Sequence, residues 1–261
     1  MAGLFDKQAD IYLDARPMYP SEWYRMLAEN TLHHSLAWDV GTGNGQAAVG
    51  VAAHYEQVIG TDISESQLKY AISHPRVRYL HTQQESMSDD ELVTLIGGDD
   101  SVDLITVAQA VHWFDLPRFY TIANRLLRKP GGLIAVWGYK QVTVTPTFDE
   151  TQRRWYETTL SYWHSKSKYL HNNYKTLPFP FESVGLGREE DPLVLDFTKE
   201  VRFEGYLRLL RSFSAVASAK EEGVDLLSEE VVKELEDAWG GAQPVRTVWY
   251  KAFMLVGKVR V

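Results

Sequence analysis

A glycine-rich turn is the first place where residue types and spacing indicate chemistry. Residues 39–46 read Asp-Val-Gly-Thr-Gly-Asn-Gly-Gln and separate an apolar, strand-like run from a helix-like run. Glycines let the backbone turn tightly and approach a ligand, and the amides that open the following helix face that ligand. Asp62 ends the next strand-like run, roughly twenty residues on, where a carboxylate accepts both hydroxyls of a ribose. The pattern predicts a site for a nucleotide-containing cofactor.

Two kinds of cofactor fit this turn. Residues 43–48 match the permissive G-x-G-x-x-A form of the dinucleotide fingerprint. Asp39 argues against a dinucleotide, because a carboxylate directly before the glycines would repel a pyrophosphate. It suits a cation instead, and the methionine part of S-adenosylmethionine carries an ammonium and a sulfonium. We therefore favour S-adenosylmethionine; the competing interpretation of Asp39 is that it only caps the glycine turn.

The elements that position these residues alternate between strands and helices. Five strands are expected, over residues 36–40, 57–61, 76–80, 102–108 and 133–139. Two intervening helices begin with the spacing of a capping box, Ser64 with Gln67 and Ser88 with Glu91. Such alternation predicts a parallel, doubly wound sheet. Ligands of these sheets lie beyond the carboxyl ends of the strands, where the glycine turn and Asp62 both fall.

The alternation stops after residue 140. One long helix is expected over residues 147–170, followed by an irregular stretch over 171–187, with eight aromatic residues between positions 155 and 181. Helices over 204–218 and 228–239 and a strand over 245–259 complete the pattern. Residues 141–196 are therefore interpreted as an insertion over one end of the sheet. Its aromatic side chains fit either helix packing or a substrate cage.

Several segments resemble the class I S-adenosylmethionine-dependent methyltransferases. The resemblance rests on the glycine turn, on Gly60 to Ser64, on Ala108 to Asp115 and on Leu127 to Gly132, together with a leader over residues 5–20. The chain is most similar to the trans-aconitate methyltransferase-like group, which includes plant embryo-abundant-type proteins. The resemblance implies an α/β fold with a Rossmann-like, doubly wound, mostly parallel seven-stranded sheet and a helical and aromatic insertion that forms a lid.

The resemblance also implies an activity. A methyl group would pass from S-adenosylmethionine to a small-molecule acceptor by in-line displacement, most readily to a carboxylate or hydroxyl oxygen, leaving S-adenosylhomocysteine. Two alternatives stay open: an NAD(P)-dependent oxidoreductase, and a non-catalytic protein that binds S-adenosylhomocysteine.

Roles for individual cofactor-binding residues follow from the resemblance. Gly41, Gly43 and Gly45 would frame the methionine portion with Asp39 beside its amine, and Asp62 would hold the ribose. The remaining positions are Ile63 on the adenine, Gln84, Glu85 and Ser86 at the adenine edge, and Ala108 and Gln109 beside the transferable methyl. Glu85 is equally well explained as an acid that favours the dipole of the following helix.

Acceptor binding is expected around His112, the one histidine that the motif puts near the methyl. His112 is either a general base or a ring that packs between Trp113 and the sheet. A carboxylate acceptor is already ionised and needs no base, whereas an alcohol needs one. Tyr12, Arg16 and Tyr19 lie in residues 1–20, which we interpret as a lid, and with Trp113 they are expected to contact the acceptor. His112 and Gln109 are the candidate catalytic residues.

Four segments of a single domain are expected. Residues 1–35 would form N-terminal lid helices and residues 36–140 the cofactor-binding core. Residues 141–196 would form the substrate-lid insertion, and residues 197–261 would complete the core sheet and its helices.

Composition excludes several classes of function. The 261 residues include 27 basic and 35 acidic side chains, a net charge of -8, which disfavours a nucleic-acid surface. Cysteine is absent, which excludes disulfides and thiolate metal sites. No metal is expected, because the pair His33-His34 lacks a carboxylate nearby. The sequence shows no apolar run of ~18 residues and no signal-like start, so we expect a cytoplasmic protein with no membrane partner. We also expect a monomer or homodimer.

Overall fold

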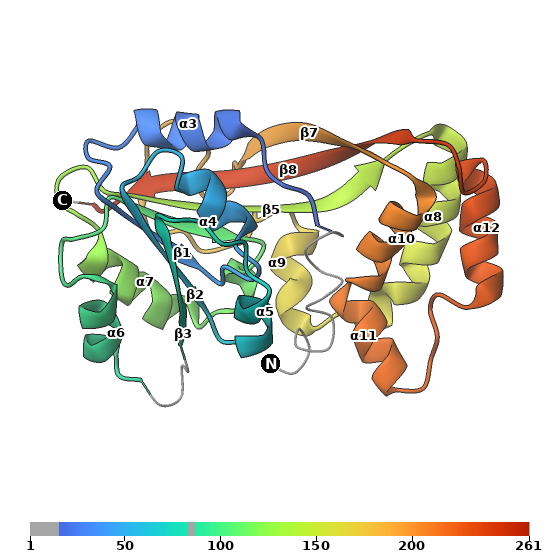
Figure 1. Ribbon diagram of the computed structural model, residues 1–261, viewed down its shortest axis with the longest axis horizontal. Coiled ribbons are helices and arrows are strands. Elements are labelled where there is room, and N and C mark those ends of the chain that lie inside the picture. The colour runs from blue at the N-terminus through green and yellow to red at the C-terminus, as the bar shows by residue number, and fades with distance from the viewer. Residues whose placement is uncertain (1–15, 83–86, 261) are drawn as a thin grey trace.

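The computed structural model describes residues 16–82 and 87–260, and its described part is organised around one mixed sheet (Figure 1). The strand order is β3-β2-β1-β4-β5-β8-β6, and β7 also pairs with β8. The first five strands are parallel, whereas β8 runs antiparallel to β5, β6 and β7. The strands are β1 (Leu36–Val40), β2 (Gln57–Asp62), β3 (Val77–His81), β4 (Leu104–Ala108), β5 (Leu133–Thr143), β6 (Glu182–Ser183), β7 (Leu193–Val201) and β8 (Arg246–Lys258).

Helices cover both faces of this sheet, as the strand and helix alternation predicts. The helices are α3 (Ser21–Glu29), α4 (Gln46–Val51), α5 (Glu65–Lys69), α6 (Asp89–Ile96), α7 (Leu116–Leu126), α8 (Pro146–Thr159), α9 (Lys168–His171), α10 (Phe203–Arg211), α11 (Ser214–Glu221) and α12 (Glu229–Trp239). In β1, Ala37 packs into the core under α3 and α4, and its neighbour Trp38 packs into the core under α6 and α7. The doubly wound, Rossmann-like α/β fold is confirmed.

Local caps start two of the helices that follow the parallel strands, α5 and α6. The Ser88 hydroxyl accepts a hydrogen bond from the amide of Glu91, whose carboxylate accepts one from the Ser88 amide, which completes the expected capping box. The Ser64 hydroxyl likewise accepts from the amide of Gln67. These short-range contacts fix the residue at which each of the two helices begins.

A second group of helices lies at the far end of the long strands. Helices α8, α10, α11 and α12 gather under the ends of β5, β7 and β8, away from β1–β3 (Figure 1). The rings of Phe148, Tyr206 and Trp239 hold three of these helices together, with Phe148 edge-on to each of the other two at centroid distances of 5.1 and 5.0 Å. The chain thus builds a separate wall at the carboxyl edge of the sheet.

Three expectations about the later elements are wrong. The described sheet has eight strands rather than seven, because β6, only two residues long, also pairs with β8. The helix expected over 147–170 ends at Thr159, where the Thr159 hydroxyl donates to the Tyr156 carbonyl and accepts from the Trp163 indole. The helix expected over 204–218 is interrupted at Ser212 and Phe213, the latter with an extended backbone.

Two of the expected segment boundaries also differ from the structure. Strand β7 begins at Leu193, so the insertion expected to end at residue 196 already includes sheet. Helix α3 does not form part of a lid, because Trp23, Tyr24 and Leu27 are buried in the core against the sheet. Of the described residues before α3, Arg16, Pro17 and Tyr19 line a cavity at the carboxyl edge.

Candidate functional site

The glycine loop between β1 and α4 adopts the backbone that its sequence requires. Gly41, Gly43 and Gly45 have φ angles of +66°, +55° and +84°, a region that other residues enter only with strain. A Cβ on Gly41 would lie 2.6 Å from that of Ala110, whereas a Cβ on Gly43 would meet only a Gln67 side-chain oxygen at 3.9 Å. Gly43 therefore faces open space into which a ligand fits.

Asp39 stabilises this loop through its buried carboxylate. The residue is 1% exposed and accepts hydrogen bonds from the hydroxyls of Thr42, at 2.5 Å, and Thr106, at 2.6 Å. Burial raises its pKa to about 6, although the two hydroxyls act in the opposite direction. Through Thr42 the carboxylate fixes the loop. Its expected contact with the cofactor amine stays a prediction.

Asp62, at the end of β2, joins the loop to the next helix. Its Oδ2 accepts from the Gly43 amide at 2.8 Å and its Oδ1 from the Ser64 amide at 2.9 Å. Two backbone donors orient the carboxylate, whose remaining acceptor capacity suits further hydroxyl donors. The side chain lines a cleft whose volume is about 850 Å³, including the part open to solvent.

The cleft collects most of the expected cofactor residues. Its wall includes Gly41, Gly43, Asp62, Ile63, Ala108 and Gln109. Gly45 and Asp39 lie outside this wall. Gly45 instead sits where a Cβ would collide with the Tyr79 ring, so it lets the loop pack on β3.

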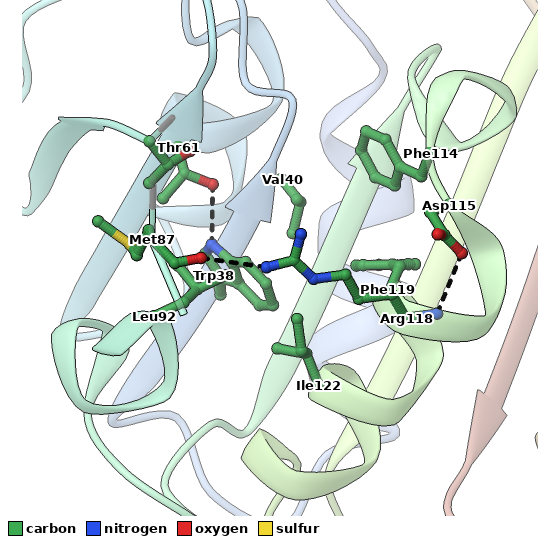
Figure 2. Close-up of a pocket in the computed structure, with 11 residues that line it drawn as sticks. Trp38, Val40, Thr61, Met87, Leu92, Phe114, Asp115, Arg118, Phe119 and Ile122 are labelled. Carbon is green, nitrogen blue, oxygen red and sulfur yellow. Dashed lines mark hydrogen bonds between the residues drawn. The ribbon is translucent and has the colours of Figure 1, made fainter. Parts of the chain in front are cut away.

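A second cavity adjoins the cleft on the side of α6 and α7 (Figure 2). Both share Val40, Thr61, Thr82 and Phe114. Arg118 reaches across this cavity from α7 and donates to the Met87 carbonyl at 3.1 Å. Thr82 and Met87 flank residues 83–86, so the expected adenine contacts of Gln84, Glu85 and Ser86 lie outside the described residues.

A third cavity opens on the other side of the strand ends. We name this cavity the acceptor pocket after its expected role, and Gln109 and Trp113 line both it and the cofactor cleft. Gln109 has a φ of +57°, and its side-chain amide nitrogen donates to the Tyr139 carbonyl at 2.8 Å. A strained backbone held this way is typical of functional sites. The two cavities therefore meet at Gln109, whose expected position beside the transferable methyl stays a prediction.

His112 lines the acceptor pocket but is nearly enclosed. It is 4% exposed and sits on a short 3-10 helix, Val111–Trp113. Its Nδ1 lies 3.2 Å from the hydroxyl of Tyr174. Burial, and secondarily the proximity of His171, lowers the pKa of His112 to about 3. The ring is neutral near pH 7 and a weak base.

Arg16 and Tyr19 reach the same region from the leader. Arg16 donates to the Tyr139 hydroxyl at 3.2 Å and to the Ser212 carbonyl at 2.9 Å, and lies over the Phe213 ring. Tyr19 packs edge-on against Trp137, 5.4 Å between centroids. Arg16 lines the acceptor pocket as well as the cavity beside the glycine loop. Tyr12 lies outside the described residues.

Several residues of the acceptor pocket belong to no sequence motif. Lys140, Tyr156, Trp163, Phe213 and Ser214 line the acceptor pocket. They come from β5, α8, the stretch that follows α8, the break before α11 and the first residue of α11. Only the cluster of aromatic residues after position 155 hinted at two of them. Gln46, on the wall beside the glycine loop, was likewise missed as a contact.

The described ranges show neither a metal-binding cluster nor a membrane-spanning helix. Within residues 16–82 and 87–260, no three His, Cys, Asp or Glu side chains lie close enough together to hold a metal ion. Over the same residues, no helix has the length and apolar character needed to cross a membrane.

The chain is similar to known proteins in sequence and in structure. A family model described as a methyltransferase domain matches residues 38–136. A solved structure from Anaeromyxobacter dehalogenans, described as a type II methyltransferase, is 31% identical, with a TM-score of 0.77 over 93% of this chain and 97% of that one. The chain belongs to the class I S-adenosylmethionine-dependent methyltransferases. This membership agrees with the strand order, the glycine loop and Asp62.

Curated methyltransferases match over shorter parts. A Dictyostelium discoideum protein described as a methyltransferase is 37% identical over 66% of this chain. A Saccharomyces cerevisiae protein described as an S-adenosylmethionine-dependent methyltransferase is 28% identical over 64%. The chain spans 64% and 56% of the lengths of these two relatives.

Proposed function

We propose that this methyltransferase moves a methyl group from S-adenosylmethionine to an oxygen of a small acceptor, preferably a carboxylate, and releases S-adenosylhomocysteine. The observation that carries the proposal is the shared wall at Gln109 and Trp113, where the cofactor cleft meets a pocket lined by Arg16 and Lys140. The resemblance to the trans-aconitate methyltransferase-like group supports a carboxylate acceptor.

The cleft has features that fit the cofactor. The side-chain nitrogen of Gln46 is buried without a hydrogen-bond partner in the described part of the chain, and Gln46 lines the cavity beside Gly43 and Arg16. A buried donor of this kind is satisfied by an anionic group such as the methionine carboxylate. Asp62 suits the ribose and Ile63 the adenine. When bound, the cofactor offers a methyl carbon that bonds to the acceptor oxygen while the carbon–sulfur electron pair returns to sulfur.

The acceptor pocket favours an anion with an apolar body. Arg16 and Lys140 are its two cationic side chains, and no Asp or Glu is among the described residues that line it. The rings of Trp113, Tyr156 and Trp163 give the pocket apolar walls, which would exclude water from it. Rate acceleration would come from holding acceptor and methyl in line, an effect worth on the order of 7 to 11 kcal/mol.

A carboxylate acceptor also fits this pocket because its methylation needs no general base. An alcohol must lose a proton during transfer, and a histidine with a pKa of about 3 is a weak acceptor for it. An ionised carboxylate needs only orientation, which the guanidinium of Arg16 provides as a planar fork. We further propose that the enzyme acts in the cytoplasm, as a monomer or homodimer, on a small molecule rather than nucleic acid.

Label transfer tests the proposal. The protein is incubated with methyl-labelled S-adenosylmethionine and matched sets of aromatic and aliphatic compounds that differ only in bearing a carboxylate, primary amide, alcohol or amine. Label should enter the carboxylates as base-labile esters. Label only in amines would refute oxygen transfer. S-adenosylhomocysteine binding without any transfer would favour the non-catalytic alternative, and a thermal shift with NAD(P) instead would favour the oxidoreductase.

A further inference from the structure

The segment after α9 holds a buried tyrosine against His112. Tyr174 is fully buried, and its hydroxyl lies 3.2 Å from Nδ1 of His112. Asn173 and Tyr174 have φ angles of +52° and +59°, a left-handed backbone that is costly for a bulky residue. Because strain of this kind persists only where the surroundings enforce it, the position of the Tyr174 side chain demands an explanation.

The direction of this hydrogen bond follows from the donors and acceptors available. Among the described residues, Nδ1 of His112 is the one hydrogen-bond partner of the Tyr174 hydroxyl. The neighbouring Tyr120 hydroxyl bonds instead to the Pro178 carbonyl, at 2.7 Å. A buried hydroxyl that donates to nothing is unfavourable, so Tyr174 donates and Nδ1 accepts. A neutral imidazole that accepts at Nδ1 carries its hydrogen on Nε2.

We propose that Tyr174 is a positioning residue that holds His112 in the Nε2–H form, so that His112 donates a hydrogen bond to an anionic acceptor instead of removing a proton from a neutral one. Nδ1 is engaged by Tyr174, so Nε2 is the ring nitrogen that meets a molecule in the pocket. This inference rests on the proposed function and adds a reason for its choice of acceptor: the pocket admits an acceptor oxygen that is already ionised.

The groups around His112 agree with a donor. Lys140, on β5, donates to the His171 carbonyl at 2.9 Å, and Lys166 donates to the Trp113 carbonyl at 2.8 Å. Arg16 faces the same pocket from the leader, and the ring of His171 lies close enough to disfavour a charge on His112. Arg16 and Lys140 thus bring positive charge to the pocket, Lys166 and His171 lie beside its residues, and none of these groups stabilises an imidazolium.

Histidine nitrogen NMR tests the proposal without any turnover. The protein is labelled with ¹⁵N-histidine, and His112 is assigned by its loss in His112→Gln. The expected spectrum shows a neutral ring with hydrogen on Nε2 from about pH 5 to pH 8, with no titration near the ordinary histidine value. A hydrogen on Nδ1, or protonation between pH 6 and 7, would overturn the proposal even if methyl transfer is confirmed.

Two tyrosine variants separate positioning from packing. In Tyr174→Phe the hydrogen should move to Nδ1 or divide between the two nitrogens, because the donor is lost. Tyr206→Phe is the matched control, since the Tyr206 hydroxyl is buried without a partner in the described residues and lies on α10. It should leave the His112 signals unchanged. If Tyr174→Phe does not fold, the wild-type spectrum still decides.

Kinetics of two His112 variants give an independent answer. Glutamine offers an amide donor near the position of Nε2, whereas asparagine offers one near Nδ1. If His112 acts as a hydrogen-bond donor, His112→Gln should keep turnover of a carboxylate acceptor within a factor of about ten of wild type. His112→Asn should show a lower turnover than His112→Gln. A base role predicts losses of about a hundredfold or more in both variants. Equal, large losses would contradict the proposal, and absence of turnover in the wild type would instead refute the proposed function.

Discussion

The two sides of the cleft are built in different ways. The cofactor side uses residues that lie where the parallel strands β1, β2 and β4 end: Gly41, Gly43, Asp62, Ile63, Ala108 and Gln109. The acceptor side takes Arg16, Lys140, Tyr156 and Phe213 from four separate segments. Local turn chemistry therefore determines the first wall, and long-range packing determines the second. Variants that affect one side and spare the other test this difference.

Arg16 should give the largest effect, because it lines cavities on both sides. Arg16→Met removes a guanidinium that is oriented by the Tyr139 hydroxyl and the Ser212 carbonyl. Hydrogen bonds to charged partners contribute about 1.5 to 3 kcal/mol each, so kcat/KM for a carboxylate acceptor should fall about a hundredfold. Steady-state kinetics measures this loss.

The control for Arg16 is another arginine near the amino terminus. Arg25 lies on α3, its side chain is 67% exposed, and its ion-pair partner among the described residues is the helix neighbour Glu29, at 3.8 Å. Arg25→Met should leave kcat/KM within about twofold of wild type, as surface ion pairs contribute little. Similar losses in both variants would indicate a general charge effect and remove Arg16 from the site.

Gly43 should give a smaller effect, confined to the cofactor side. Gly43→Ala strains the backbone and adds a methyl group where the cofactor is expected. Gly98→Ala is the matched control, because Gly98 also has a positive φ, +95°, and a Cβ there meets nothing within 4 Å. Both variants should lose similar stability, but only Gly43→Ala should bind S-adenosylhomocysteine at least tenfold more weakly by calorimetry. Equal affinities would show that Gly43 faces no ligand.

The effect of Asp39 should be on stability rather than on a binding step, as a dependence of stability on pH. Its folded pKa, about 6, lies above its ordinary value of 3.8, so the folded protein binds the proton more tightly than the unfolded chain. Its contribution is therefore favourable below about pH 4 and is lost as pH rises to about 6. Asn lacks this titration and still pairs with Thr42 and Thr106. The stability of Asp39→Asn relative to wild type should rise by up to roughly 3 kcal/mol over that range.

Denaturant titrations of both proteins at several pH values measure the Asp39 effect. Asp103→Asn serves as the control, because Asp103 is equally buried but pairs with the Arg128 guanidinium at 2.6 Å. That variant should be destabilised, since it breaks the ion pair. A stability difference for Asp39→Asn that does not change with pH would contradict a raised pKa.

The cofactor side could be predicted from the sequence because its signals are short in range. Glycines at three alternate positions, a carboxylate after the second strand and two serine caps each constrain only their own turn. The structure then places Gly43 and Asp62 in direct contact, 2.8 Å apart. Asp39, whose role the sequence left open, contacts two threonines, and only Thr42 is close to it in sequence.

The acceptor side could not be predicted, because no local pattern specifies it. Strand β5 was expected to stop at Tyr139, but it continues to Thr143 by pairing with Trp249 of β8 and so carries Lys140 to the pocket. The break at Ser212 and Phe213 falls inside a helical sequence pattern. It gives Arg16 a carbonyl and an aromatic face, a contact between residues 196 positions apart.

Calorimetric titration with S-adenosylhomocysteine tests most directly whether the two sides are separate. Wild type should bind one ligand per chain, and Asp62→Ala should weaken binding at least tenfold, through loss of a carboxylate that orients Gly43 and accepts ribose hydroxyls. Lys140→Met, on the acceptor side, should bind within about twofold of wild type. Unchanged affinity in Asp62→Ala, or equal losses in both variants, would contradict a cofactor site at the glycine loop with a separate acceptor pocket beyond Gln109.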